Sequence, residues 1–253
     1  MGEGENGGAI ALVGAGEFLD TMNAVDRALL EMAGGSRVVV LPTASAPDGP
    51  GVPEHWAQMG IEHFNRLGAQ TEAVMALDRT ACFDSTLAER VRAANLVYFS
   101  GGKPDYLYNT LVETPVWAAV RAVLERGGMV VGCSAGAMIM GSHVPAFSKR
   151  LGVPWVGGWQ PAFELVPQGI IIPHYNELPE IMAGVVFGRR PPGSFLIGVD
   201  AHTALVGANG QWRVMGMGRV TLRQGREVKR YTQGQTMLLP TGSKVTANTS
   251  VQT

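Results

Sequence analysis

The sequence has few cysteines and no long apolar run, and these absences exclude several classes of protein. Only Cys82 and Cys133 occur among 253 residues, at a spacing that matches no zinc or haem motif. We therefore expect two reduced thiols, no structural disulfide and a cytoplasmic location. No apolar stretch approaches the roughly 18 residues that a membrane-spanning helix needs. Residues 1–8 are polar and rich in glycine, unlike a signal peptide.

The sequence also lacks an excess of charge of either sign. Its 20 Lys and Arg residues nearly balance 21 Asp and Glu residues, for a formal net charge of −1. No overall basic field would attract a phosphate backbone or an anionic bilayer, so we expect neither a nucleic-acid nor a membrane partner. We also expect no metal and no cofactor. The oligomeric state is left open, with a homodimer as one alternative.

Apolar runs of strand length alternate with segments of helical period in the first half of the chain. This pattern is typical of βα units and a largely parallel sheet. The expected strands are residues 9–13, 37–41, 72–77, 96–99 and 129–132, and the expected helices are residues 22–32, 56–67 and 116–124.

Shorter strands separated by turns follow residue 195. They are expected at residues 196–199, 203–206, 211–215, 219–222 and 227–231, with an Asn209-Gly210 hairpin turn. We predict an α/β fold, a largely parallel twisted sheet flanked by helices with antiparallel C-terminal edge strands. It forms one domain over residues 1–240, and a mobile polar tail covers residues 241–253.

The segment Gly132-Cys133-Ser134-Ala135-Gly136 places a serine between an expected strand and the helix-compatible run 137–140. In that context the G-x-S-x-G pattern is typical of a nucleophile elbow, with small neighbours because larger side chains would collide with the strand and helix. The Ala135 amide is the expected first oxyanion donor. The alternative is a plain turn with Ser134 as helix N-cap. Cys133 is expected to be a buried packing residue.

A second glycine-rich loop, Ser100-Gly101-Gly102-Lys103, follows the expected strand 96–99. Glycines at a strand's carboxyl end let the backbone approach a ligand closely, so we assign Gly101 to substrate binding and the Gly102 amide as second oxyanion donor. Lys103 is a candidate to hold a substrate carboxylate, as are Lys149 and Arg150.

Together these segments resemble peptidase family S51, the family of aspartyl dipeptidase and cyanophycinase, whose fold is akin to class I glutamine amidotransferases. The resemblance spans about residues 8–222 and includes Val13-Gly14-Ala15-Gly16-Glu17-Phe18, the elbow read as Gly-x-Ser-Ala-Gly-Ala, and Ile172-Pro173-His174-Tyr175. It implies that Ser134 attacks a carbonyl and that His174, after an apolar strand, takes its proton. The competing histidines are His55, His63, His143 and His202.

The third member of a Ser-His-carboxylate arrangement is not evident. In the family the acid that orients the histidine falls in a Gly-Ile-Asp-Glu-like segment, and Ala201 occupies the glutamate position here. Glu177 lies three residues after His174 and can reach it across one turn. Asp200 substitutes only if its strand has already ended, because neighbouring strand residues face opposite sides. Glu164 is a further alternative.

We therefore predict a serine peptidase or amidase that acts on a small acidic or modified peptide or amide. The stretch Tyr175-Asn176-Glu177 lacks the arginines that follow the histidine in cyanophycinase-like members, which argues against cyanophycin; Asn176 is assigned to substrate binding. The alternative is a catalytically weakened homologue that serves as a binding or regulatory protein because of Ala201. Glutaminase activity is disfavoured because that chemistry uses a cysteine at the elbow.

Overall fold

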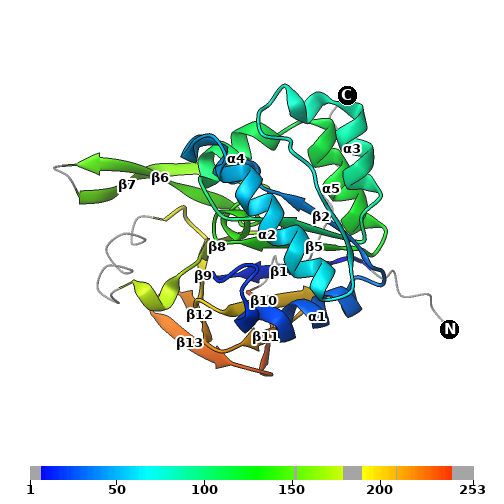
Figure 1. Cartoon of the computed structure of the whole chain (residues 1–253). Coiled ribbons are helices and arrows are strands. Elements are labelled where there is room, and N and C mark those ends of the chain that lie inside the picture. Colours follow the sequence, from blue (N-terminus) through cyan, green and yellow to red (C-terminus); the bar gives the residue numbers. More distant parts are fainter. Residues whose placement is uncertain (1–6, 151–152, 179–189, 209, 241–253) are drawn as a thin grey trace.

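An eight-stranded sheet forms the centre of the computed structural model, which describes residues 7–150, 153–178, 190–208 and 210–240 (Figure 1). Its spatial order is β14 (Thr236–Met237), β11 (Gln211–Gly216), β10 (Thr203–Ala208), β1 (Ala9–Val13), β5 (Met129–Cys133), β4 (Leu96–Phe99), β2 (Arg37–Leu41) and β3 (Gln70–Ala73). The five strands from β1 to β3 are parallel, and β10, β11 and β14 form an antiparallel edge. This is the predicted fold class.

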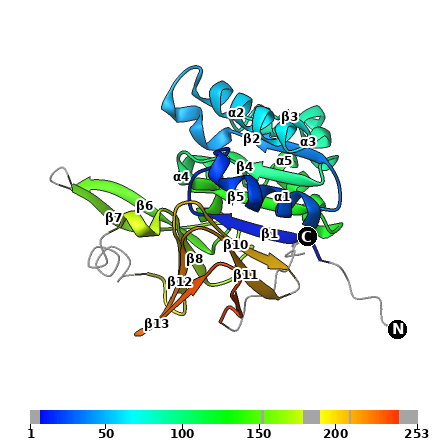
Figure 2. The ribbon, with the colours of Figure 1, turned by 60° about the horizontal axis from the view of Figure 1, so that its bottom comes forward.

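Helices cover both faces of this sheet because successive strand residues point to opposite sides (Figures 1 and 2). In β1, Ala11 and Val13 pack with α1 and α2, whereas Ile10 and Leu12 join the core of α3, α4 and α5. The helices are α1 (Asn23–Met32), α2 (Val52–Arg66), α3 (Ser85–Arg92), α4 (Pro104–Leu111), α5 (Pro115–Glu125) and α6 (Ala135–Met138). Short 3-10 helices are η1 (Asp20–Met22), η2 (Thr43–Asp48), η3 (Ala81–Phe83) and η4 (Tyr175–Glu177).

The predicted strand at residues 72–77 is wrong in its position. β3 pairs with β2 from Gln70 to Ala73 and then leaves the sheet. Val74 and Ala76 are nevertheless fully buried. Their apolar character therefore serves packing of the connection to η3 rather than strand pairing.

A second sheet was not predicted as a separate unit. It consists of β13 (Glu227–Thr232), β12 (Arg219–Gln224), β9 (Phe195–Val199) and β8 (Gly169–Ile172). The C-terminal strands are thus divided between two sheets, and the chain crosses from the second to the first between Val199 and Thr203. This crossing brings the end of β9 to the carboxyl end of β1, where Gly14 lies against the Asp200 backbone.

A two-stranded hairpin, β6 (His143–Arg150) with β7 (Val153–Pro161), extends away from both sheets in Figures 1 and 2. The antiparallel pairing of β10 with β11 is as predicted, whereas Asn209 of its turn and the expected tail at residues 241–253 lie outside the described residues. Over the part of the chain that the structure describes, no helix is sufficiently long and apolar to cross a bilayer.

Candidate active site

Ser134 stands between β5 and α6 in a backbone conformation that side chains rarely adopt. Its φ is 51° and its ψ is −112°, whereas Cys133 ends the strand and Ala135 begins the helix. Such strain is characteristic of functional positions, where the surrounding structure holds the residue in place. The predicted strand–turn–helix context is therefore present. The helix is a single turn that ends at Met138, shorter than the expected run to residue 140.

The elbow glycines are required by close backbone contacts. A Cβ atom on Gly132 would lie 2.2 Å from the carbonyl oxygen of Gly136, and one on Gly136 would lie 2.6 Å from the carbonyl oxygen of Phe99. Both distances are far shorter than van der Waals contact. A side chain at either position would therefore collide with backbone, as the sequence pattern predicts.

His174 faces Ser134 from the second sheet. Its Nε2 atom lies 3.2 Å from Ser134 Oγ, and its own φ of 51° marks a sharp turn after β8. Among the histidines in the described residues, His174 is the one in hydrogen-bond contact with Ser134. The hydrogen bonds from Ser142 N and Oγ to the Gly169 carbonyl connect the segment after α6 to β8, so the two sheets hold the pair in register.

Glu177 lies beside the other nitrogen of the imidazole. Its Oε2 atom is 3.3 Å from His174 Nδ1, across the single turn of η4. The structure thus brings Ser134, His174 and Glu177 into one chain of contacts. Within the described ranges, no hydrogen bond or ion pair joins Asp200 or Glu164 to His174.

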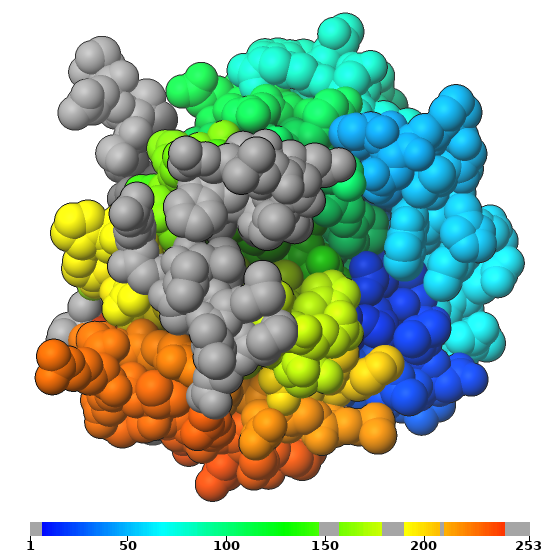
Figure 3. All heavy atoms as spheres, turned by 90° about the vertical axis from the view of Figure 1, so that its left-hand side faces the viewer, coloured from blue at the N-terminus to red at the C-terminus, as the bar shows by residue number. Residues whose placement is uncertain are grey.

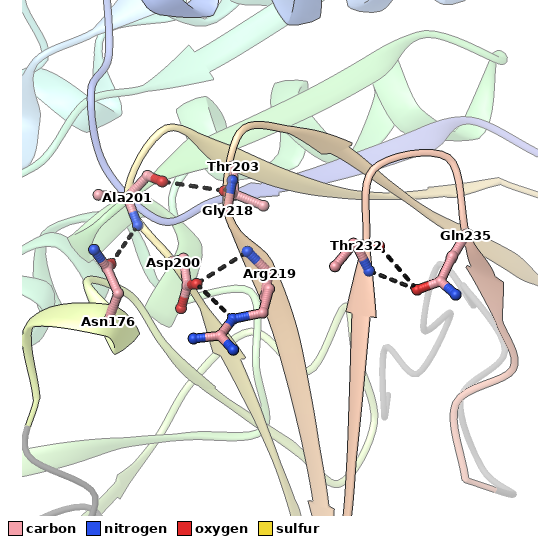
Figure 4. A network of polar contacts seen from close by, with 8 residues as sticks. All are labelled: Asn176, Asp200, Ala201, Thr203, Gly218, Arg219, Thr232 and Gln235. Carbon is pink, nitrogen blue, oxygen red and sulfur yellow. Dashed lines mark hydrogen bonds and ion pairs between the residues drawn. The ribbon is translucent and has the colours of Figure 1, made fainter.

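Asp200 and Asn176 have other partners, shown in Figure 4. The buried Asp200 carboxylate accepts a hydrogen bond from Arg219 N at 3.0 Å, and the Arg219 guanidinium lies 3.7 Å away. Asn176 Oδ1 accepts a hydrogen bond from Ala201 N at 2.8 Å. Asn176 therefore ties η4 to the β9–β10 crossing. It links the turn that carries His174 to Ala201.

The second glycine loop lies directly against the elbow. A Cβ atom on Gly101 would be 3.3 Å from Ser134 Cβ, and one on Gly102 would be 2.2 Å from the Ala44 carbonyl oxygen. Gly102 also has a φ of 144°, which favours glycine. In the described part of the chain, neither the Gly102 nor the Ala135 amide donates to a protein acceptor.

Lys103, the third site residue predicted in this loop, is exposed and forms an ion pair. Its Nζ atom lies 3.3 Å from Asp48 Oδ1 on η2, and the two side chains are 58% and 34% exposed. The Lys103 ammonium is therefore available for exchange with a solvent-borne carboxylate. The side chains of Lys149 and Arg150 lie outside those that the structure describes.

The sequence analysis did not identify Glu17 as a site residue, although Glu17 lies in the segment 13–18 that supports the family resemblance. Its carboxylate is buried, and it accepts hydrogen bonds from Gly101 N at 3.0 Å and from Cys133 Sγ at 2.9 Å. Burial first, and then the Glu17 charge, raise the pKa of the Cys133 thiol well above its ordinary value. Cys133 is buried as expected, but it is a hydrogen-bond donor as well as a packing residue.

The Ser134–His174 pair is accessible from one side of the molecule. Figure 3 shows the yellow-green segment that ends with η4 lying next to the blue N-terminal segment. Ser134 and His174 are both partly exposed. Within the described residues, no group of three or more His, Cys, Asp or Glu side chains is arranged to hold a metal ion.

Comparisons with known proteins identify the family and the fold. A solved structure of a peptidase from an acI-B1 Actinobacterium is 32% identical, with a TM-score of 0.83 over 93% of this chain and 98% of the other. A putative peptidase E protein from Listeria monocytogenes EGD-e shares the fold at 18% identity, with a TM-score of 0.60 over 84% of this chain and 100% of the other. The model of peptidase family S51 matches residues 10–215, and the chain belongs to that family.

Proposed function

We propose that the protein is a serine peptidase or amidase in which Ser134 is the nucleophile and His174 is the general base. The observation that carries this proposal is the 3.2 Å contact between Ser134 Oγ and His174 Nε2 at a strained elbow. A nucleophile and base within hydrogen-bond reach, with the base oriented by a third group, are the parts that acyl transfer needs. Glu177 supplies the third group in this proposal.

The protonation states follow from these contacts. If the Nδ1–H group of His174 donates to Glu177, the lone pair on Nε2 is free to accept the Ser134 hydroxyl proton. Ser134 Oγ then bonds to the substrate carbonyl carbon, and His174 returns the proton to the leaving amine as the amide bond breaks. Water then attacks the carbonyl carbon of the acyl-enzyme while His174 takes a proton from the water. His174 gives this proton to Ser134 Oγ as the bond between Oγ and the acyl group breaks.

The Gly102 and Ala135 amides are proposed to stabilise the negatively charged oxygen of the tetrahedral intermediate. Ala135 follows Ser134 in the chain, and Gly102 follows Gly101, where a Cβ atom would lie 3.3 Å from Ser134 Cβ. Both amides lack a protein acceptor among the described residues. An amide without a partner can donate to a developing oxyanion at no cost to another hydrogen bond. Each such donor contributes about 10²–10³-fold in kcat in well-studied hydrolases.

The substrate is proposed to be a small acidic or modified peptide or amide. Lys103 directly follows Gly102, and its ammonium is held by the partly exposed Asp48. A substrate carboxylate that enters beside Gly102 could replace Asp48 as the partner of Lys103. This would place the acidic group next to the oxyanion donors, with the scissile carbonyl at Ser134.

A fluorophosphonate probe tests the nucleophile directly. We expect covalent labelling of the wild-type protein at one site and no labelling of Ser134→Ala, measured by intact-mass spectrometry. His174→Ala should slow labelling strongly because the hydroxyl loses its base. Hydrolysis of a panel of acidic and neutral dipeptides then tests the substrate class.

The competing function is a binding or regulatory protein derived from such an enzyme. The observation that favours it is Ala201, which leaves the family acid position without a carboxylate, together with the exposure of Glu177. Absence of labelling in a wild-type protein that is folded by circular dichroism would move the conclusion to this alternative.

A further inference from the structure

Glu17 is a buried carboxylate without a basic partner in the described part of the chain. It is 8% exposed, and its two oxygens are occupied by Gly101 N and Cys133 Sγ. No ion pair with a lysine, arginine or histidine involves it among the described residues. Burial of a carboxylate is costly unless hydrogen bonds compensate for lost hydration, so a residue chosen only to fill space would be apolar.

The two donors to Glu17 belong to the two segments that flank the nucleophile. Gly101 is the residue before Gly102, and Cys133 is the residue before Ser134. A Cβ atom on Gly101 would lie 2.8 Å from Glu17 Oε1 and 3.3 Å from Ser134 Cβ. The carboxylate, on the loop after β1, therefore joins the segments at the carboxyl ends of β4 and β5.

The Cys133 thiol keeps its proton in this arrangement. Burial and the nearby Glu17 charge both raise the Cys133 pKa, so the sulfur donates to Glu17 and is not a competing nucleophile. The contact fixes the residue immediately before Ser134. The Gly101 amide is fixed in the same way, whereas the Gly102 amide has no protein acceptor within the described ranges.

We propose that Glu17 is a positioning residue that holds the glycine loop and the elbow in register. Through Gly101 and Cys133 it sets the relative placement of the Gly102 and Ala135 amides, the two proposed oxyanion donors. This inference rests on the proposed hydrolase function. It assigns to Glu17 no contact with the substrate and no proton transfer.

Two variants of similar size separate hydrogen bonding from packing. Glu17→Gln keeps an oxygen that accepts from Gly101 N and an amide group that can donate to the Cys133 sulfur. Glu17→Leu fills the space but accepts no hydrogen bond. We expect Glu17→Leu to slow fluorophosphonate labelling and to lower kcat by about 10–100-fold with KM changed less than about threefold, and Glu17→Gln to stay within about fivefold of wild type.

Asp26→Asn is the control for general destabilisation. Asp26 is a second buried carboxylate, and among the described residues its hydrogen bond is to His63 rather than to the glycine loop or the elbow. We expect this variant to lower the melting temperature without slowing the labelling of Ser134. Thermal melts of all variants allow each labelling rate to be compared at temperatures where the protein is folded.

A second pair keeps the test informative if Glu17→Leu does not fold. Cys133→Ser retains a donor to Glu17, and Cys133→Ala removes it. We expect Cys133→Ala to label more slowly than Cys133→Ser. If Glu17→Leu or Cys133→Ala is labelled as fast as the wild type, the positioning role of Glu17 is overturned and the hydrolase proposal stays intact. Failure of the wild-type protein itself to label would instead overturn the proposed function, and the positioning role with it.

Discussion

The Glu177 carboxylate lies 3.3 Å from His174 Nδ1, on the opposite side of the imidazole from Ser134. The His174 and Glu177 side chains are 41% and 59% exposed, so water screens their interaction. Exposed ion pairs contribute about 1 kcal/mol or less, whereas loss of a buried triad acid costs about 10⁴-fold in rate. We expect Glu177→Ala to lower kcat by only about 3–10-fold with little change in KM.

Steady-state kinetics on a cleaved amide substrate measures this effect. Glu227→Ala is the matched control, because Glu227 is an exposed carboxylate paired with Lys229 on β13. It should leave kcat unchanged. A loss of about 10³-fold or more in Glu177→Ala would instead show that Glu177 acts as a full triad acid. Unchanged kinetics would remove Glu177 from the mechanism.

Ser134 is predicted to reduce the stability of the fold through its backbone conformation. A non-glycine residue at φ 51° and ψ −112° costs about 1–3 kcal/mol. Ser134→Gly relieves this strain, whereas Ser134→Ala removes the hydroxyl and keeps the strain. We expect the free energy of unfolding of Ser134→Gly to exceed that of Ser134→Ala by about 1 kcal/mol, after allowing for the greater chain entropy of unfolded glycine. Denaturant unfolding of both variants measures this difference. Equal stabilities would contradict stored strain at the elbow.

Cys82 is predicted to make stability fall at alkaline pH. Burial, followed by the Asp78 charge, raises the Cys82 pKa from 9.0 to about 11. Because the folded pKa is the higher one, this stabilisation is fully present below the unfolded pKa and is lost as pH rises through the folded pKa. From about pH 8 to about pH 10.5, the stability advantage of wild type over Cys82→Ala should shrink by about 2 kcal/mol. Urea unfolding of both proteins across this pH range measures the stability difference. A difference that does not change with pH would exclude the raised Cys82 pKa.

The sequence was sufficient to predict the parallel sheet and the Ser134–His174 pair. Apolar runs alternate with helical segments, and this local pattern determines which residues enter the core on each face. The elbow was recognisable because its glycines are dictated by contacts between segments close in the chain, such as Gly132 with Gly136. Glu177 could be nominated because three residues separate it from His174.

Features that depend on contacts between distant segments could not be predicted. His63, one of the competing histidines, is fully buried against Asp26 from another helix, 37 residues away in sequence. Glu17 meets Cys133 116 residues later. A hydrophobic period cannot indicate which buried polar groups will pair. The division of the C-terminal strands between two sheets likewise depends on which strand edges meet in space.

Lys103 is predicted to contribute to substrate affinity rather than to turnover. Its ammonium is exposed beside Gly102 and held by Asp48. Lys103→Met should raise KM for acidic peptides by up to about fivefold, because an exposed charge pair contributes up to about 1 kcal/mol. KM for neutral amides and kcat should stay constant. Lys229→Met, which removes another exposed paired lysine, is the control. Equal changes for acidic and neutral substrates would argue against the assignment.

The last prediction concerns Ala201, the position at which the family resemblance places an orienting glutamate. The Ala201 amide donates a hydrogen bond to Asn176 Oδ1, two residues after His174, so Ala201 lies beside the turn that follows His174. In wild type, Glu177 already occupies Nδ1, and an added carboxylate would compete with it. The effect should therefore be clearest in a Glu177→Ala background.

We expect Ala201→Glu to restore kcat in the Glu177→Ala variant to at least the wild-type value, because a carboxylate again accepts from Nδ1–H and stabilises the imidazolium. Ala201→Gln is the matched control, since its amide can accept the hydrogen bond but carries no charge. It should restore less. Rescue by neither variant would show that position 201 does not reach His174 and that Glu177 has no substitute there.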